Sequence, residues 1–164
     1  MSAGEEHDVL VAGLGNVLLA DDGFGVEVAR RLAAEALPAG VRVTDFGIRG
    51  AHLAYELTGG YRGAILVDAM SRGQAPGTIY VFEPDMETDL DAPAMDAHGL
   101  DPGSVLRMLH RLGGDGPVKL LVVGCEPSEI LERVGLSAPV AHAVEEALRL
   151  VKRTLETEFR EDKS

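Results

Sequence analysis

The chain has 164 residues, 46% of them hydrophobic, which suits one compact domain with a buried core and argues against a second domain. Its formal net charge of −12 argues against nucleic acid as a partner, because a polyanion would be repelled, and favours a basic partner or a cation. Cys125 is the only cysteine, which excludes an internal disulfide and leaves His, Asp or Glu to hold any metal.

The chain shows no segment with the pattern of a signal peptide, and no apolar run long enough to cross a bilayer. We therefore expect a cytoplasmic protein without membrane insertion. We also expect one domain over 1–164, present as a monomer, with mobile termini over 1–7 and 160–164.

Strand and helix patterns alternate along the chain. Apolar runs rich in β-branched residues predict strands, and apolar residues at helical spacing predict helices. The predicted strands are "DVLVAG" (8–13), "VRVTDFG" (41–47), "GAILVDAM" (63–70), "TIYVFEP" (78–84) and "VKLLVVG" (118–124). The predicted helices are one from Gly25 onward, "HLAYEL" (52–57), "DPGSVLRMLHRL" (101–112) and the closing segment 139–161.

This alternation predicts a three-layer α/β/α sandwich around a mixed, mostly parallel sheet of five strands. Only "SRGQAPG" separates the third strand from the fourth, which is too short for a crossover helix. The fourth strand is therefore expected to run antiparallel. If the first three strands lie in the order 2-1-3, ligands should bind where the ends of strands one and three flank the point at which the strand order reverses.

The segment "GLGNVLLADDGFG" (13–25) has the glycines of a phosphate-binding turn but also two adjacent carboxylates, Asp21 and Asp22. A dinucleotide-binding turn needs a third glycine where this chain has Leu18, and like charge would repel a pyrophosphate. One aspartate could cap the following helix. Because the second is left over, we interpret the loop as a site for a cation.

Two further residues are expected near this loop. Asp68 ends the third strand, at the same sheet edge, and His98 ends a long acidic connection over 85–99 that can fold over the same crevice. Each alone could be a turn residue or a helix start. Together, two carboxylates and one imidazole predict an open site for nickel, zinc, manganese or iron.

The motif "GLGNVLLADDGFG" resembles the signature of the hydrogenase maturation proteases, the endopeptidases of [NiFe]-hydrogenase assembly. The resemblance extends along the whole chain, because further motifs follow in the same order. They are "DFG", "LVDAM", "APGTIYVF", "DAHGL" and "VVGCEP". By this resemblance, the protein removes a C-terminal extension from the large-subunit precursor of a [NiFe]-hydrogenase once nickel has been inserted.

The resemblance also implies roles for individual residues. It places the recognition of nickel, carried by the substrate, on Asp22, Asp68 and His98, and activity or substrate docking on Asp45. No tightly bound cofactor is expected in the free protein. The sequence "GIRG" departs from the "GGTAG" of several members, so Arg49 is a candidate for selecting the hydrogenase that is accepted.

Two other functions remain open at this point. A cysteine hydrolase could use Cys125 with His98 and Asp68, although the neighbouring Glu126 would disfavour a thiolate. A non-catalytic nickel-binding assembly factor could offer the same ligands without cleaving a peptide.

Overall fold

The computed structural model describes residues 8–84, 101–113 and 116–159, and the five-stranded sheet at its centre has the order β2-β1-β3-β5-β4. The strands are β1 (Val9–Leu14), β2 (Val41–Gly47), β3 (Gly63–Ala69), β4 (Ile79–Phe82) and β5 (Lys119–Cys125). The first three and β5 run parallel, and β4 pairs antiparallel with β5. The predicted mixed sheet and its antiparallel fourth strand are confirmed, and the first three strands have the order 2-1-3 that the expected ligand position required.

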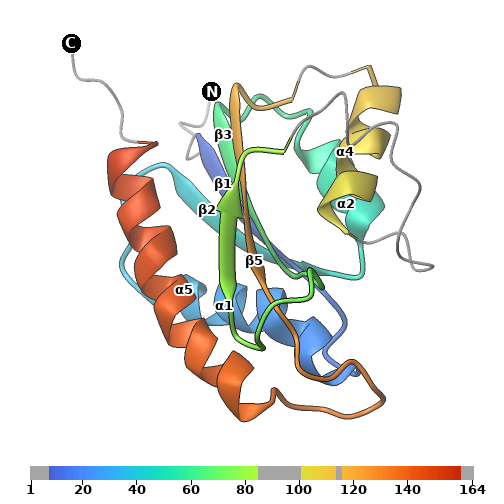
Figure 1. Ribbon diagram of the computed structural model, residues 1–164. Helices are drawn as coiled ribbons and strands as arrows, with labels where there is room; N and C mark the ends of the chain where they lie inside the picture. Colours follow the sequence, from blue (N-terminus) through green and yellow to red (C-terminus); the bar gives the residue numbers. More distant parts are fainter. Residues whose placement is uncertain (1–7, 85–100, 114–115, 160–164) are drawn as a thin grey trace.

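Helices cover both faces of this sheet, as predicted (Figure 1). The helices α1 (Phe24–Ala33) and α5 (Ala138–Thr157) lie on one face. The helices α2 (Gly50–Glu56) and α4 (Pro102–Arg111) lie on the other. A short 3₁₀ turn, η1 (Ala20–Gly23), which the sequence did not predict, leads into α1. The expected mobile termini and the connection over 85–99 lie outside the described residues.

Alternation along β1 supplies both halves of the core. Val9 and Val11 pack in the cluster that contains the buried faces of α1 and α5. Leu10 and Ala12, which point to the opposite face, pack in the cluster that contains those of α2 and α4. A strand buried on both faces needs an unbroken apolar run, and this is the pattern that β1 and β3 have in the sequence.

Close backbone contacts explain the glycines of the segment 13–25. A Cβ atom on Gly25 would lie 2.1 Å from the carbonyl oxygen of Val67 and 2.4 Å from that of Leu14. One on Gly15, whose φ is +136°, would lie 1.9 Å from the carbonyl oxygen of Asp22. These glycines therefore allow the first loop and α1 to approach β1 and β3, a packing role that needs no bound phosphate.

None of the helices in the described part of the chain has the length and apolar character that crossing a bilayer requires.

We predict that Gly25→Ala lowers the free energy of unfolding by about 3 kcal/mol or more and the Tm by about 6–12 °C, because the methyl group would meet two sheet carbonyls that cannot move without breaking strand pairing. Urea denaturation would measure this loss. Gly103→Ala, inside α4, is the matched control: its Cβ would meet only side-chain atoms, at 3.3 and 3.5 Å, and alanine favours a helix. Equal stability of Gly25→Ala and wild type would contradict the prediction.

Candidate active site

The carboxyl ends of the parallel strands bring three of the four predicted site residues to one edge of the sheet, the lower edge in Figure 1. Asp22 lies in η1, directly after β1 and its loop, Asp68 lies near the end of β3, and Asp45 lies near the end of β2. Parallel pairing of β2 and β3 with β1 produces this gathering, because strands that run in the same direction end at the same edge.

Asp22 and Asp68 both border the turn formed by Gly15 and Asn16. The backbone amide of Asn16 donates to Oδ2 of Asp22 at 2.8 Å. Oδ1 of Asp68 lies 3.7 Å from the point where a Cβ atom on Gly15 would stand, and it accepts from the amide of Ala69 at 2.8 Å. The side chain of Asp68 is buried, whereas Asp22 is partly exposed. A glycine at position 15 thus leaves room for the backbone of Asp22 and the carboxylate of Asp68 beside the same turn.

The third predicted metal ligand, His98, lies outside the described residues. Within the part of the chain that the structure describes, no group of three or more His, Cys, Asp or Glu side chains is placed to hold a metal ion. Asp22 and Asp68 provide hard oxygen donors at one turn, which suits a divalent cation if further ligands come from elsewhere. The three-ligand site stays a prediction.

Asp45 stands at the rim of a hollow of about 210 Å³ beside this turn. The hollow is lined by residues of the first loop, by Val26 and Arg30 of α1, and by the end of β2. Oδ2 of Asp45 lies 3.8 Å from Nε of Arg30. Oδ1 is buried and has no hydrogen-bond partner among the described residues. A buried acceptor without a donor is costly, and the Asp45 side chain as a whole is 36% exposed, so its rotation toward the hollow would let this atom accept from a bound peptide amide.

Arg49 follows β2 at the same edge, but its guanidinium bonds to its own loop. Nη2 donates to the carbonyl oxygen of Asp45 at 2.7 Å, and Nε donates to that of Phe46 at 3.3 Å. These contacts hold the end of β2 in place. The role of Arg49 in selecting a substrate stays a prediction.

Asp21 has a role that the sequence did not predict. Its side chain does not cap α1, and its hydrogen-bond partners lie far from the turn of Gly15 and Asn16 in the sequence. The residue before α1 is Gly23, and no side chain caps that helix. The Asp21 carboxylate is fully buried and accepts four hydrogen bonds, from the amides of Ser128, Glu129 and Ser137 and from the hydroxyl of Ser137, at 2.7–3.0 Å. It joins the first loop to a segment more than 100 residues away.

The donors around Asp21 decide its protonation. Burial alone would raise the pKa of this carboxyl, but the hydrogen bonds from Ser137, Glu129 and Ser128 outweigh burial and hold the pKa below its ordinary value. The group is therefore ionised at neutral pH, and a buried charge with four donors fixes the geometry of the loop.

Glu126 is a second buried carboxylate at this edge, and it organises the connection between β3 and β4. Its Oε1 accepts from the hydroxyl of Tyr80 at 2.6 Å and from the amides of Arg72 and Gln74 at 2.8 and 3.1 Å. The amide of Met70 also donates to the carbonyl oxygen of Cys125 at 2.8 Å. The connection that follows Asp68 is thus tied to the end of β5.

Cys125 is buried, and its environment is unsuited to a nucleophile. Burial, together with the negative charges of Asp21 and Glu126, raises the pKa of its thiol to about 12. A thiol with this pKa is protonated at neutral pH, whereas catalysis needs the thiolate. The burial and the raised pKa of this thiol therefore argue against the cysteine hydrolase that the sequence left open.

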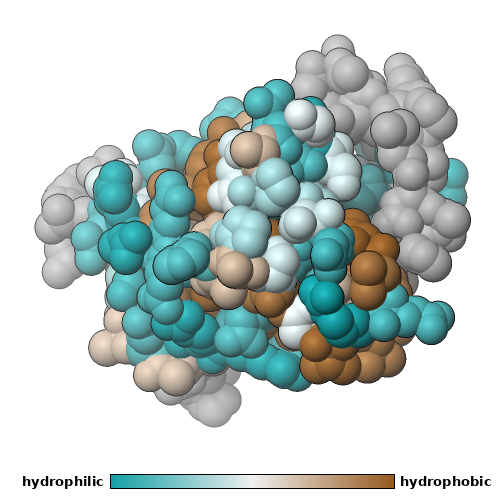
Figure 2. All heavy atoms as spheres, turned by 60° about the horizontal axis from the view of Figure 1, so that its bottom comes forward, coloured by the Kyte–Doolittle hydropathy of each residue, from teal (hydrophilic) through white to brown (hydrophobic). Residues whose placement is uncertain are grey.

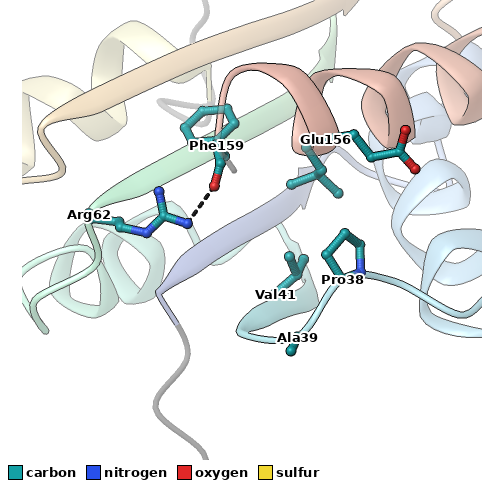
Figure 3. A pocket seen from close by; sticks show the side chains of 7 residues that line it. Pro38, Ala39, Val41, Arg62, Glu156 and Phe159 are labelled. Atoms are coloured by element: carbon teal, nitrogen blue, oxygen red, sulfur yellow. Dashed lines mark hydrogen bonds between the residues drawn. The ribbon is translucent and has the colours of Figure 1, made fainter. Parts of the chain in front are cut away.

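A larger hollow, of about 360 Å³, lies at the opposite edge of the sheet, between the start of β2 and the end of α5 (Figure 3). Arg62 lies beside Phe159 at this hollow and donates to its carbonyl oxygen. Its walls are mostly apolar, and the candidate residues Asp22, Asp45 and Asp68 are not among those that line it. We therefore assign the candidate active site to the smaller hollow, which is lined by Asp45 and by the turn of Gly15 and Asn16 that Asp22 and Asp68 border.

Comparisons with known proteins identify the family to which this α/β fold belongs. Residues 26–154 match the family model of the hydrogenase maturation proteases (HycI). The chain is 32% identical over 149 residues to the hydrogenase 2 maturation protease of Escherichia coli, covering 90% of each chain. It is 34% identical over 156 residues to the hydrogenase expression/formation protein HupD of Rhodobacter capsulatus, covering 91% of this chain and 73% of HupD.

The solved structures agree with this assignment. The fold is similar to that of the hydrogenase maturating endopeptidase HybD from E. coli, with a TM-score of 0.77 and 28% identity over 92% of this chain and 93% of HybD. It is also similar to a hydrogenase 2 maturation peptidase from a thaumarchaeote, with a TM-score of 0.70 and 30% identity over 90% of this chain and 97% of the other. The chain belongs to the hydrogenase maturation protease family, as its sequence motifs indicated.

We predict that Asp21→Asn lowers the free energy of unfolding by about 2–4 kcal/mol at neutral pH, because the amide loses the charge and presents a donor to groups that are themselves donors. Because the folded pKa lies below the unfolded value, this stabilisation is present above about pH 4 and is lost as the pH falls through the folded pKa. The difference between wild type and variant should therefore shrink on acidification.

Urea denaturation at neutral pH and at about pH 3 would measure both effects. Glu145→Gln is the control, since it removes an exposed carboxylate paired with Arg31, a pair whose loss costs at most about 1 kcal/mol. A difference between Asp21→Asn and wild type that does not change with pH would contradict the argument.

Proposed function

We propose that this protein is an endopeptidase that removes the C-terminal extension from the large-subunit precursor of a [NiFe]-hydrogenase after nickel has been inserted. The observation that carries the proposal is the placement of Asp22 and Asp68 around the turn of Gly15 and Asn16, beside a hollow that also contains Asp45. The family supports proteolysis, and the names of relatives support hydrogenase maturation.

The nickel ion in this proposal is cargo of the substrate, and Asp22, Asp68 and His98 are the residues that would receive it. Two carboxylates and an imidazole are a suitable donor set for nickel. Bound nickel supplies Lewis acidity that can polarise the scissile carbonyl or lower the pKa of a water molecule. A precursor without nickel would lack this anchor, so cleavage would follow metal insertion.

Asp45 would position the peptide rather than hold the metal. Its Oδ1 is a buried acceptor without a donor among the described residues, at the rim of the hollow beside Gly15. An amide of an extended peptide in this hollow would provide the missing donor. The Arg30 guanidinium near Oδ2 would help to orient the carboxylate.

We further propose that the free protein works in the cytoplasm as a monomer without a tightly bound cofactor. A site with three ligands leaves coordination positions open for the substrate, and it holds a metal weakly until the substrate completes it. Metal analysis after washing with a chelator tests this point, and stoichiometric nickel would contradict it.

The decisive experiment incubates the chelator-washed protein with nickel-loaded and nickel-free precursor and measures the mass of the precursor. The expected result is loss of a C-terminal peptide from the nickel-loaded precursor alone. Cleavage of both forms would contradict the dependence on nickel. Binding of the loaded precursor without cleavage would favour the non-catalytic assembly factor.

We predict that Asp22→Asn, Asp68→Asn and His98→Ala each reduce cleavage of the nickel-loaded precursor by 100-fold or more. The reason is that a site with three ligands loses most of its affinity for the metal when one ligand is removed. The fold should be retained, with a Tm within about 8 °C of wild type. Glu145→Gln is again the control, with unchanged cleavage. Full activity of any two of the three variants would overturn the assignment of the site.

A further inference from the structure

Four large apolar side chains are exposed along the two segments that Asp21 joins. Their exposed fractions are 61% for Leu18, 50% for Ile130, 46% for Leu131 and 73% for Val134. We call these four residues the apolar surface. They belong to the first loop and to the segment 128–137, at the lower edge of the molecule in Figure 1. Figure 2 turns this edge forward and shows apolar groups between polar ones on that face.

Backbone hydrogen bonds join the first loop to the segment 128–137. The amide of Arg133 donates to the carbonyl oxygen of Leu18 at 3.1 Å, and the amide of Ala20 donates to that of Arg133 at 2.7 Å. The amide of Asp21 donates to the carbonyl oxygen of Glu129 at 3.1 Å. With the four bonds to the Asp21 carboxylate, these contacts hold the segment 128–137 against the first loop.

Within this segment only Leu136 packs against the core. A buried charge is costly to desolvate, and here its hydrogen bonds fix a segment in which Ile130, Leu131 and Val134 are exposed. Two of the three charged groups in the segment are paired, with Nη1 of Arg133 3.0 Å from Oε2 of Glu129, and Glu132 adds one exposed negative charge. The surface is therefore rigid and mostly apolar in a chain of net charge −12. Such a surface indicates an interface, because rigidity lowers the entropy lost on association.

The position of the surface identifies its occupant. Leu18 also lines the hollow that contains Asp45, and Ile48, which is 56% exposed, lines the same hollow from the end of β2. A peptide in this hollow would therefore continue onto the apolar surface. We propose that the apolar surface docks the folded body of the hydrogenase precursor, next to the tail that the hollow receives; this inference rests on the proposed function.

The partner is a protein face with apolar groups, because four exposed apolar side chains dominate the surface and Glu132 is its one charged side chain outside the pair of Arg133 and Glu129. Asp21 is then a positioning residue, since it keeps the docking segment in register with the loop that carries Asp22. Docking on the apolar surface would bring the scissile bond to Asp22 and Asp68, and the residues of this surface would take no part in the cleavage itself. The surface should affect the concentration of precursor that is required, and leave the maximal rate unchanged.

The test replaces Leu131 and Val134 together, as L131E/V134E and as L131S/V134S, so that the effects of charge and of lost apolar area are separated. We expect each double variant to raise the concentration of nickel-loaded precursor for half-maximal processing by tenfold or more, with a maximal rate within twofold of wild type. The matched control is L112E/V118E, which replaces two exposed apolar side chains, 54% and 94% exposed, away from the hollow. The control should behave as wild type.

Two measurements keep this inference separate from the proposed function. Binding of the same precursor is measured directly by interferometry, so an absence of cleavage in wild type would overturn the proposed function while the docking surface is still tested. Sedimentation of wild type and variants reports self-association. An unchanged concentration dependence in both double variants would overturn the inference, and so would a wild-type dimer that these variants dissociate.

Discussion

The carboxyl edge of this molecule depends on the buried carboxylate of Asp21. Burying a charge is unfavourable unless it is fully hydrogen-bonded, and Asp21 accepts four hydrogen bonds from residues more than 100 positions away. Its neighbour Asp22 lies in the same 3₁₀ turn, but the Asp22 side chain has a different partner and accepts a hydrogen bond from the amide of Asn16. Adjacent aspartates in a tight turn point in different directions, so one organises the scaffold while the other faces the candidate site.

The glycines of the first loop impose a second constraint, which is steric. Gly25 has the carbonyl oxygens of Val67 and Leu14 within 2.4 Å of the point where a Cβ atom would stand. Gly15 similarly leaves no space for a side chain beside the backbone of Asp22. In a dinucleotide-binding fold, comparable glycines allow a pyrophosphate to approach the backbone. Here they allow protein backbone to approach protein backbone, which brings Asp22 and Asp68 to the same turn.

Local patterns in the sequence predicted the sheet and its layers because the signals are contained within each element. β1 and β3 are continuous apolar runs, and the seven residues of "SRGQAPG" are too few for a crossover helix. The same reasoning placed Asp68 at the edge that the loop of Asp22 follows, since parallel strands end together, whereas Asp45 was indicated by the resemblance to the family. It could not reveal the roles of Asp21 and Glu126, because their partners are 46–116 residues away and are mostly backbone amides, which any sequence provides. His98, outside the described residues, is known only from its motif.

Rigidity at this edge has a consequence for the proposed function. Asp22, the orphan oxygen of Asp45 and the apolar surface lie on segments that are fixed to one another through β1, η1 and the segment 128–137. A folded precursor that carries its nickel and its tail in a fixed relation can contact all three together, and the entropy lost in the first contact is not lost again for the others. A precursor in a different conformation can satisfy one contact but not the set. Under this proposal, the protein distinguishes nickel-loaded from nickel-free precursor by the relative positions of several contacts along this edge of the sheet. No single contact has to be strong.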